Sequence, residues 1–324
     1  MAQISRPLRL TFYILVILAG TVLSAGLAMR HAERQTLVEE AARANEQLGL
    51  YANSLHTLIE RYRALPAVLA LDPELRAALQ GPVATETQDA LNRKLEKING
   101  AARSSTLELL NHEGLAVAAS NWRLPSSYVG HNYGFRPYFK QTRSQGSGRF
   151  YAVGVTSGIP GYFLASAVKA DNQDFLGAMV VKLEFPELEH EWSQGNDTLL
   201  VSDARGIVFI ANQPGWRYRH LQPLSSNDLE EIKLTRQYDK QPLTPLQHQT
   251  LQRFDDNSSL ARVEGPEGRA SYLWESLPLA AEGWTLHLLR KPPNAFEETR
   301  NAGLAAAGAW LTLVFLLLLS LIHI

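Results

Sequence analysis

One segment, residues 130–164, holds the side chains best suited to bind a small anion. Arg136 precedes Pro137 there, and proline is favoured at the first position of a helix, so we expect Arg136 at or beside a helix N-cap. The N–H groups of the first helical turn would then point outward, and they belong to Tyr138, Phe139 and Lys140. Unpaired donors, the helix dipole and a bidentate cation together favour a carboxylate.

Two segments after this helix add polar groups. The expected strand 149–155 leads into Thr156-Ser157-Gly158, which offers hydroxyl and backbone donors. The apolar run 177–183 predicts a second strand, and it contains Lys182. A lysine in such a strand lies at a sheet edge, extends its head to solvent, or points into a polar pocket. Composition alone leaves these three positions open.

Each residue also has a structural interpretation. Arg136 could form a surface salt bridge, and Tyr133 and Tyr151 could pack in the core. Residues 156–158 could form a simple turn. We predict that Arg136→Ala abolishes ligand binding and leaves the thermal unfolding of the empty domain nearly unchanged. A large loss of stability in the empty domain would instead mark Arg136 as structural.

The remaining composition narrows the class of function. Cysteine is absent, so no disulfide framework, thiol chemistry or cysteine-ligated metal site is expected. His112 and His131 lack acidic or histidine neighbours at ligand spacing, so no metal site is expected. No Gly-x-Ser-x-Gly, phosphate-loop or His-Glu-x-x-His motif occurs, which argues against catalysis. A net charge of −1 gives no electrostatic argument for nucleic acid.

Two hydrophobic runs, residues 10–29 and 302–322, bracket the chain. Each has about the twenty residues that a helix needs to cross a bilayer. The first also competes with a cleavable signal peptide, although it is longer than an ordinary signal core. Arg6 and Arg9 place residues 1–9 in the cytoplasm by the positive-inside rule. We therefore expect two membrane helices, with the residues between them on the side away from the cytoplasm.

A long helical pattern follows the first run, over residues 31–79, with an interruption at Pro66. Its apolar positions alternate spacings of three and four: Leu48, Tyr51, Leu55, Leu58, Tyr62 and Leu65. This seam fits either a helix packed along its own sheet or a stalk that dimerises. A second helix is expected over residues 85–103.

Two similar β-hairpins come next, over residues 106–120 and 198–211. Each turn begins with Asn or Asp and ends with the glycine that a positive φ requires, at Gly114 and Gly206. The repeat predicts two related α/β modules in tandem, with a seam near residues 186–197. In the second module we expect a helix over 227–238, a polar loop to about residue 252, and strands over 259–263, 270–275 and 284–289.

Three stretches, NYGFRPYF, GRFYAVGVTSGIPGYF and VVKLEF, closely resemble the periplasmic sensor region of C4-dicarboxylate transport sensor histidine kinases, the DctB family. The resemblance covers essentially the whole chain. It implies an α/β (α+β) fold: a long N-terminal helix and two tandem PAS-like (double Cache, PDC) modules with antiparallel sheets, between two transmembrane helices. The implied location is the bacterial inner membrane, with the sensor in the periplasm. The implied divisions are a stalk and second helix (30–103), a membrane-distal module (104–190) and a membrane-proximal module (191–300).

The resemblance also implies a function and a site. The membrane-distal module would bind succinate, fumarate or malate, with Arg136 and Lys182 gripping the two carboxylates. The other implied contacts are hydroxyls of Tyr133, Tyr151, Thr156 and Ser157, and wall or backbone groups of Val155 and Gly158. Together with Tyr138 in the first turn, these residues make up the predicted ligand-binding site.

The resemblance further implies binding partners that no motif in this sequence indicates. They are a second copy of the chain, a cognate response regulator and a dicarboxylate permease. No His-box or nucleotide-binding motif occurs, so we expect that a cytoplasmic transmitter domain is missing from this chain. ATP and Mg would bind that domain, and we expect no cofactor in this chain. The final Ser-Leu-Ile-His-Ile (320–324) also resembles a translated sequencing-adapter tail.

Two other functions fit the sequence. One is a double-Cache receptor for another small anion or an amino acid, with a chemoreceptor or cyclic-dinucleotide output. The ammonium group of an amino-acid ligand would need a carboxylate partner such as aspartate, and no aspartate lies within residues 133–163. The other is a membrane-tethered scaffold that binds a transporter through the second module, for which the apolar seam and residues 225–260 would matter more than Arg136.

Overall fold

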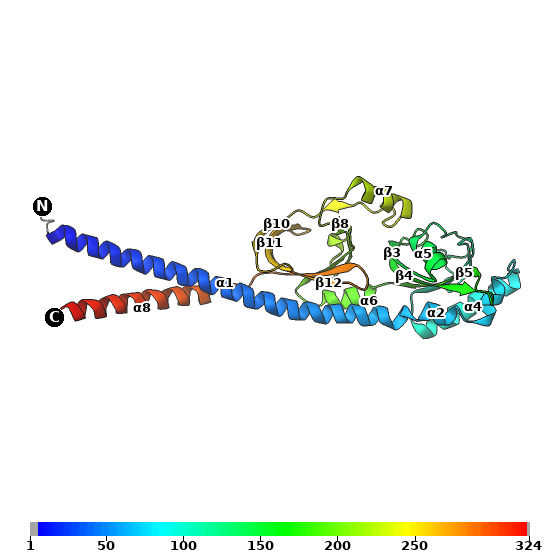
Figure 1. Ribbon diagram of the computed structural model, residues 1–324, viewed down its shortest axis with the longest axis horizontal. Coiled ribbons are helices and arrows are strands. Elements are labelled where there is room, and N and C mark those ends of the chain that lie inside the picture. Colours follow the sequence, from blue (N-terminus) through cyan, green and yellow to red (C-terminus); the bar gives the residue numbers. More distant parts are fainter. Residues whose placement is uncertain (1–5, 323–324) are drawn as a thin grey trace.

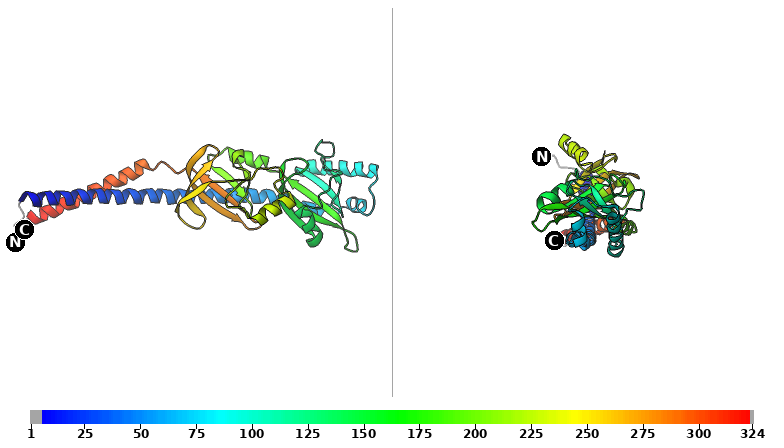
Figure 2. Two further views of the ribbon diagram at one scale, coloured as in Figure 1. Left: turned by 90° about the horizontal axis from the view of Figure 1, so that it is seen from above. Right: turned by 90° about the vertical axis from the view of Figure 1, so that its right-hand side faces the viewer.

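The computed structural model describes residues 6–322, so the expected segments 1–9 and 320–324 lie partly outside the described residues. The molecule is elongated: helix α1 (Arg6–Arg63) runs along two sheet modules that follow one another (Figures 1 and 2). Helix α8 (Phe296–Ile322) returns beside the start of α1, so both ends of the chain lie at the same end of the molecule. The predicted fold class, with its long helix and antiparallel sheets, is confirmed.

The first module is built on a five-stranded antiparallel sheet in the order β2-β1-β5-β4-β3. Its strands are β1 (Thr106–Asn111), β2 (Ala116–Ala119), β3 (Ser147–Val153), β4 (Pro160–Lys169) and β5 (Phe175–Leu183). Its helices are α2 (Leu65–Leu69), α3 (Pro73–Ala78), α4 (Thr85–Ala102) and α5 (Pro137–Gln145). Helices α1 to α4 contribute to the core on one face of the sheet, and α5 contributes to the core on the other face.

The second module repeats this plan. Its strands are β6 (Thr198–Ser202), β7 (Val208–Ala211), β10 (His248–Arg253), β11 (Ser258–Gly265), β12 (Gly268–Leu279) and β13 (Trp284–Arg290). The order β7-β6-β13-β12-β11-β10 matches the first sheet strand for strand and adds β10 at the edge. Helix α6 (Pro186–Ser193) connects β5 of the first sheet to β6 of the second. The remaining elements of the second module are the short helix η1 (Pro214–Trp216), α7 (Ser226–Thr235), and the two-stranded parallel pair β8 (Arg219–His220) and β9 (Thr244–Pro245). The repeated hairpin therefore marks the repeat of a whole module.

The two hairpin turns are built by the same local chemistry. In the first, Asn111 Oδ1 accepts the N–H groups of Glu113 and Leu115, at 3.0 and 2.9 Å. In the second, Asp203 Oδ1 accepts those of Arg205 and Ile207, both at 2.9 Å. Each turn closes at a glycine in the left-handed region, with φ of 86° and 74°.

One part of the second module differs from the prediction. The polar segment before residue 252 was expected to be a loop, but it contains β9 and β10. The β10 sequence, His-Gln-Thr-Leu-Gln-Arg, is mostly exposed and pairs with β11 at the edge of the sheet. Strand β10 is held by backbone hydrogen bonds to β11, which do not require alternating hydrophobic residues. The sequence therefore shows no strand pattern there.

The apolar seam of α1 packs on the molecule's own modules. Leu48 and Leu55 are fully buried, and Tyr62 donates a hydrogen bond to the carbonyl of Arg103 at 2.8 Å. The hydrophobic core that contains them also includes strands of both sheets. Of the two interpretations of the heptad spacing, the structure shows the helix packed along its own domain.

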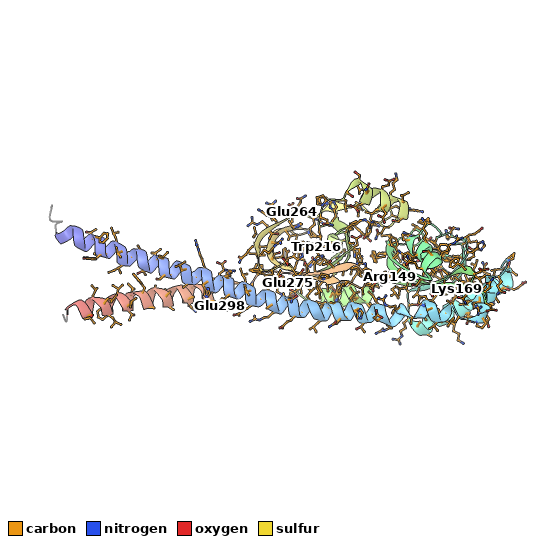
Figure 3. The ribbon with its side chains drawn as sticks, in the orientation of Figure 1. Arg149, Lys169, Trp216, Glu264, Glu275 and Glu298 are labelled. Carbon is orange, nitrogen blue, oxygen red and sulfur yellow. The ribbon has the colours of Figure 1, made fainter. Side chains whose placement is uncertain are left out.

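Helices α1 and α8 pack against each other beyond the modules. Among the described residues, these two helices are long and apolar enough to cross a membrane. Trp310 lies against Gly20, where an added Cβ would be 2.3 Å from the indole ring, and it donates to the carbonyl of Ile17 at 3.2 Å. Closer to the modules, Thr36 donates to Glu298 at 2.9 Å (Figure 3).

Candidate ligand-binding site

Arg136 is the N-cap residue of α5, as predicted, and Pro137 occupies the first turn. Its side chain is 1% exposed and reaches the second module. Nη1 donates to the carbonyls of Thr235 and Arg236, both at 3.0 Å, and Nη2 donates to the carbonyl of Val153 at 2.7 Å. Since Thr235 and Arg236 end helix α7, the guanidinium group binds the negative end of a helix in the neighbouring module.

The first turn of α5 offers fewer free donors than the sequence suggested. The N–H groups of Phe139 and Lys140 both donate to the carbonyl of Arg136, at 3.1 and 3.2 Å. The expectation that they point freely outward is therefore corrected: the N-cap carbonyl already accepts them. Recognition at this site depends on side chains instead.

Arg136 lines a small cavity between α5 and the first sheet. The lining residues are Glu108, Tyr128, Tyr133, Arg136, Tyr138, Gly154, Val155, Thr156 and Phe163. The free space is about 10 Å³, which is roughly one water molecule. A four-carbon diacid therefore requires one wall to move. Five predicted site residues meet here: Tyr133, Arg136, Tyr138, Val155 and Thr156.

One wall of the cavity belongs to the loop 154–159 between β3 and β4, which contributes Gly154, Val155 and Thr156. Thr156 Oγ1 lies 2.8 Å from the hydroxyl of Tyr133, and Ser157 Oγ accepts from Tyr128 at 3.3 Å. Gly158 is exposed and has a φ of 69°, and its N–H donates to Gly154 at 2.7 Å. Polar contacts between hydroxyl groups link this loop to the cavity wall, and a ligand can replace such contacts.

Lys182 lies on β5 beside the same loop and is 1% exposed. Its Nζ donates to Glu184 at 2.6 Å, to the carbonyl of Ile159 at 3.0 Å and to Ser157 Oγ at 3.4 Å. Room for this side chain comes from Gly161, where a Cβ would lie 2.5 Å from Lys182 Cε. Of the three positions open to this lysine, the structure shows the one directed into a polar interior.

Tyr151 does not join this group. Successive side chains of a strand point to opposite faces, and Tyr151 lies on the face away from the cavity. Its ring centroid is 4.0 Å from that of Phe209, and its hydroxyl donates to the Phe209 carbonyl at 3.0 Å. The expectation of a ligand contact is corrected here: Tyr151 joins the two modules.

Glu108 is a member of the site that the sequence analysis missed. It lies on β1, is 2% exposed, and accepts a hydrogen bond on Oε1 from the Tyr138 hydroxyl at 3.3 Å. Its Oε2 has no hydrogen-bond partner among the described residues. Burial raises the pKa of this carboxyl to about 7, although Tyr138, Lys182 and Arg136 act in the opposite direction. A charged residue in an alternating strand usually marks the solvent face, which is why the pattern concealed it.

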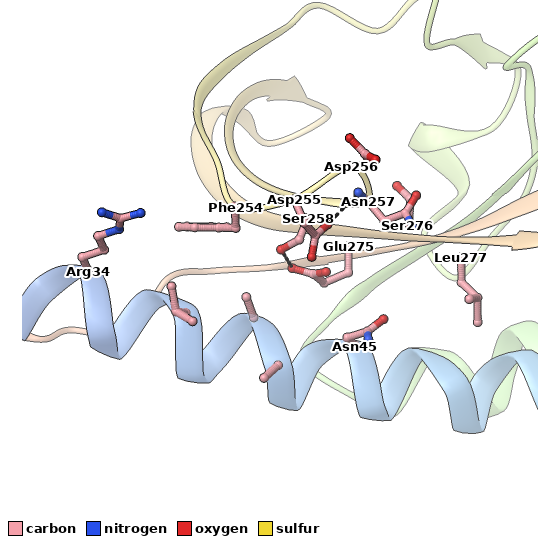
Figure 4. Close-up of a pocket in the computed structure, with 13 residues that line it drawn as sticks. Arg34, Asn45, Phe254, Asp255, Asp256, Asn257, Ser258, Glu275, Ser276 and Leu277 are labelled. Carbon is pink, nitrogen blue, oxygen red and sulfur yellow. Dashed lines mark hydrogen bonds between the residues drawn. The ribbon is translucent and has the colours of Figure 1, made fainter.

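A larger cavity of about 620 Å³ lies between α1 and the second sheet (Figure 4). Glu275 there accepts a hydrogen bond from Ser258 at 2.5 Å, and Asp255 and Asp256 lie nearby. Arg34 alone is cationic among its described lining residues. This cavity is therefore poorly suited to a dianion. Within residues 6–322, no three His, Cys, Asp or Glu side chains are grouped to hold a metal ion.

Comparisons with known proteins agree with this architecture. No family model matches the chain. The chain is 34% identical over 317 residues to the C4-dicarboxylate transport sensor protein DctB of Rhizobium meliloti (strain 1021), covering 96% of this chain and 51% of that protein. The protein of the same name from Pseudomonas aeruginosa is 32% identical over 285 residues, covering 88% and 43%. The chain thus spans about half the length of the curated relatives it matches.

A solved structure agrees with these two relatives. The sensor domain of the Vibrio cholerae histidine kinase DctB superposes with a TM-score of 0.72 at 27% identity, covering 79% of this chain and 98% of that domain. The chain belongs to the DctB family. The periplasmic domain of RsbU from Chlamydia trachomatis, with a TM-score of 0.59 at 17% identity, shares the fold of this DctB-family chain.

Proposed function

We propose that this chain is the sensor region of a two-component sensor histidine kinase and binds a C4-dicarboxylate such as succinate, fumarate or malate. The observation that carries the proposal is a pair of buried cations, Arg136 and Lys182, that both contact the segment 153–159. Arg136 donates to the carbonyl of Val153, and Lys182 donates to Ser157 Oγ and to the carbonyl of Ile159. The dicarboxylate named in both curated relatives supports it.

The chemistry of the two cations suits a diacid. A guanidinium group has five N–H donors, so the three bonds from Arg136 to carbonyls leave donors for a carboxylate. Lys182 would exchange its long contact to Ser157 for the second carboxylate as the loop moves. A monoacid leaves one desolvated cation without its partner, which costs on the order of 1.5–3 kcal/mol, roughly ten- to a hundredfold in affinity.

The arrangement of the molecule suggests how the sensor is placed. We assign residues 10–29 and 302–322 to two crossings of a bacterial inner membrane, with the modules 104–190 and 191–300 in the periplasm. The two apolar helices that pack together at one end of the molecule support this assignment. Signalling would pass through a homodimer to a cytoplasmic transmitter and a cognate response regulator, with a dicarboxylate permease as a further partner.

Calorimetric titration of the detergent-solubilised chain with succinate tests the proposal. We expect saturable binding of succinate and none of acetate. Lys182→Met should weaken succinate binding at least about tenfold, because a carboxylate loses its charge-assisted donor. Lys169→Met, a matched change at an exposed lysine at the far end of the same module (Figure 3), should leave binding unchanged. A folded chain that binds no dicarboxylate would refute the proposal.

A further inference from the structure

Glu108 is an acid placed where a dianion is expected to bind. It lines the cavity with Arg136, and its Oε2 is buried without a hydrogen-bond partner among the described residues. An isolated buried carboxylate loses its hydration and gains nothing in return. In the ordinary case such a group forms a close ion pair with a nearby cation.

The cations near Glu108 do not fill that role. Lys182 is paired with Glu184 at 2.6 Å, and Arg136 donates to backbone carbonyls. Within residues 6–322, no ion pair shorter than 4.0 Å involves Glu108, so these cations act on it only at longer range. Two tyrosines complete its surroundings: Tyr138 donates to Oε1, and Tyr133 lies within electrostatic range. The facing positions of the adjacent strands are Ala119 and Val180, which are apolar.

The charge balance changes when a dicarboxylate enters. With Glu184 and Glu108 ionised, the ligand would bring the number of carboxylates to four against two cations. Protonation of Glu108 removes one negative charge and turns its free oxygen into an O–H donor. A protonated carboxyl can then donate to a ligand carboxylate, whereas an ionised one repels it.

Accepting the proposed function, we propose that Glu108 is the residue of this site that carries a proton when the ligand is bound. It is protonated in the complex and donates a hydrogen bond to a ligand carboxylate, so that binding of a C4-dicarboxylate takes up one proton from solution. The affinity for the dianion therefore falls with rising pH, where the free carboxyl is ionised.

Proton uptake can be measured directly on the full chain in detergent. Succinate is titrated at about pH 8 in two buffers with different ionisation enthalpies, and the difference in observed heat gives the protons bound. Succinate is fully ionised there, so a proton must enter the protein. We expect close to one proton per succinate, and a dissociation constant that rises about tenfold per pH unit above this pH.

The same titration on the Glu108→Gln variant is the second test. This substitution keeps the size of the side chain and a donor at the free position, so we expect the variant to bind succinate without proton uptake and without the pH dependence. Glu113→Gln, a matched change at an exposed carboxylate just after the same strand, should keep both properties of the unmodified chain. If Glu108→Gln fails to fold, the proton count of the unmodified chain still decides.

Two results would overturn the inference. Succinate binding without proton uptake would do so while leaving the proposed function in place. So would aspartate binding that takes up no proton and is lost in Glu108→Gln, because Glu108 would then be the partner of an ammonium group. Absence of binding by any diacid would instead remove the proposed function and this inference together.

Discussion

At the scale of single residues, Arg136 has two roles that the sequence could not separate. It lines the cavity, and it donates to three backbone carbonyls, two of which end helix α7 of the other module. The guanidinium group is thus part of the empty protein's structure as well as a candidate ligand contact.

This double role revises the expected effect of Arg136→Ala. Removing the side chain leaves three carbonyls without their donor, so we expect the free energy of unfolding of the empty protein to fall by about 2–4 kcal/mol. Urea unfolding of the ligand-free chain measures it. Arg143→Ala, an exposed arginine on the same helix, is the matched control. An unchanged unfolding free energy would restore the purely ligand-binding interpretation.

The sequence placed most of the candidate site, and the failures have physical causes. Arg136 was found from the proline that follows it, and Lys182 from its position within an apolar strand. Tyr151 was misplaced because the resemblance carries no information on which face a strand residue occupies. Glu108 was missed because its strand shows the alternation of an ordinary half-exposed strand, although both faces of this sheet are covered.

At the scale of elements, the contact between α1 and α8 depends on glycines. A Cβ at Gly20 would lie 2.3 Å from Trp310, and one at Gly303 would lie 2.4 Å from Met29. Small residues let apolar helices approach closely in a bilayer, where hydrophobic burial does not drive them together.

Gly20→Leu should therefore separate the two helices. The chain has no cysteine, so the pair Met29→Cys and Gly303→Cys can report their proximity by oxidative cross-linking. We expect Gly20→Leu to reduce the cross-linked fraction to roughly half or less, because the indole ring must move. Gly26→Leu is the matched control, because nothing lies within 4 Å of a Cβ there. Equal cross-linking in both variants would contradict the packing.

Helices and strands were predicted well wherever interactions between residues close in sequence form them. The two hairpins follow from an Asn or Asp that accepts backbone N–H groups and a glycine with positive φ, and both are readable in the sequence. The strand β10 is held by pairing with β11, a non-local cause that leaves no pattern. The heptad spacing was ambiguous since packing on a sheet and pairing with another helix can require the same seam.

At the scale of the whole molecule, one carboxylate joins α1 to both modules. Glu282, in the turn before β13, forms ion pairs with Arg63 at the end of α1 and with Arg149 of β3, the latter at 3.5 Å. It also accepts a hydrogen bond from Tyr162 of β4, and its side chain is only 4% exposed. Arg149 lies on the side of the first module that faces the second (Figure 3).

Glu282→Gln should loosen this junction. Because Arg63 and Arg149 keep part of their hydration, we expect a loss of about 1–3 kcal/mol in the free energy of unfolding. Succinate affinity should stay unchanged, since Glu282 does not line the cavity. Glu187→Gln, at an exposed position of α6, is the control for urea unfolding. An unchanged free energy of unfolding would show that the junction does not depend on Glu282 and that other contacts hold the modules together.

Helix α1 is continuous from Arg6 to Arg63, and this continuity has a mechanical consequence. At about 1.5 Å per residue, its 58 residues form a rod of roughly 87 Å. Its later half is embedded in the cores of both modules, and its first half is packed on α8. For a rigid lever arm of this length, a tilt of about one degree at one end displaces the other by roughly 1.5 Å. A tilt this small where the modules hold α1 therefore becomes a displacement of about atomic size at the far end of the molecule.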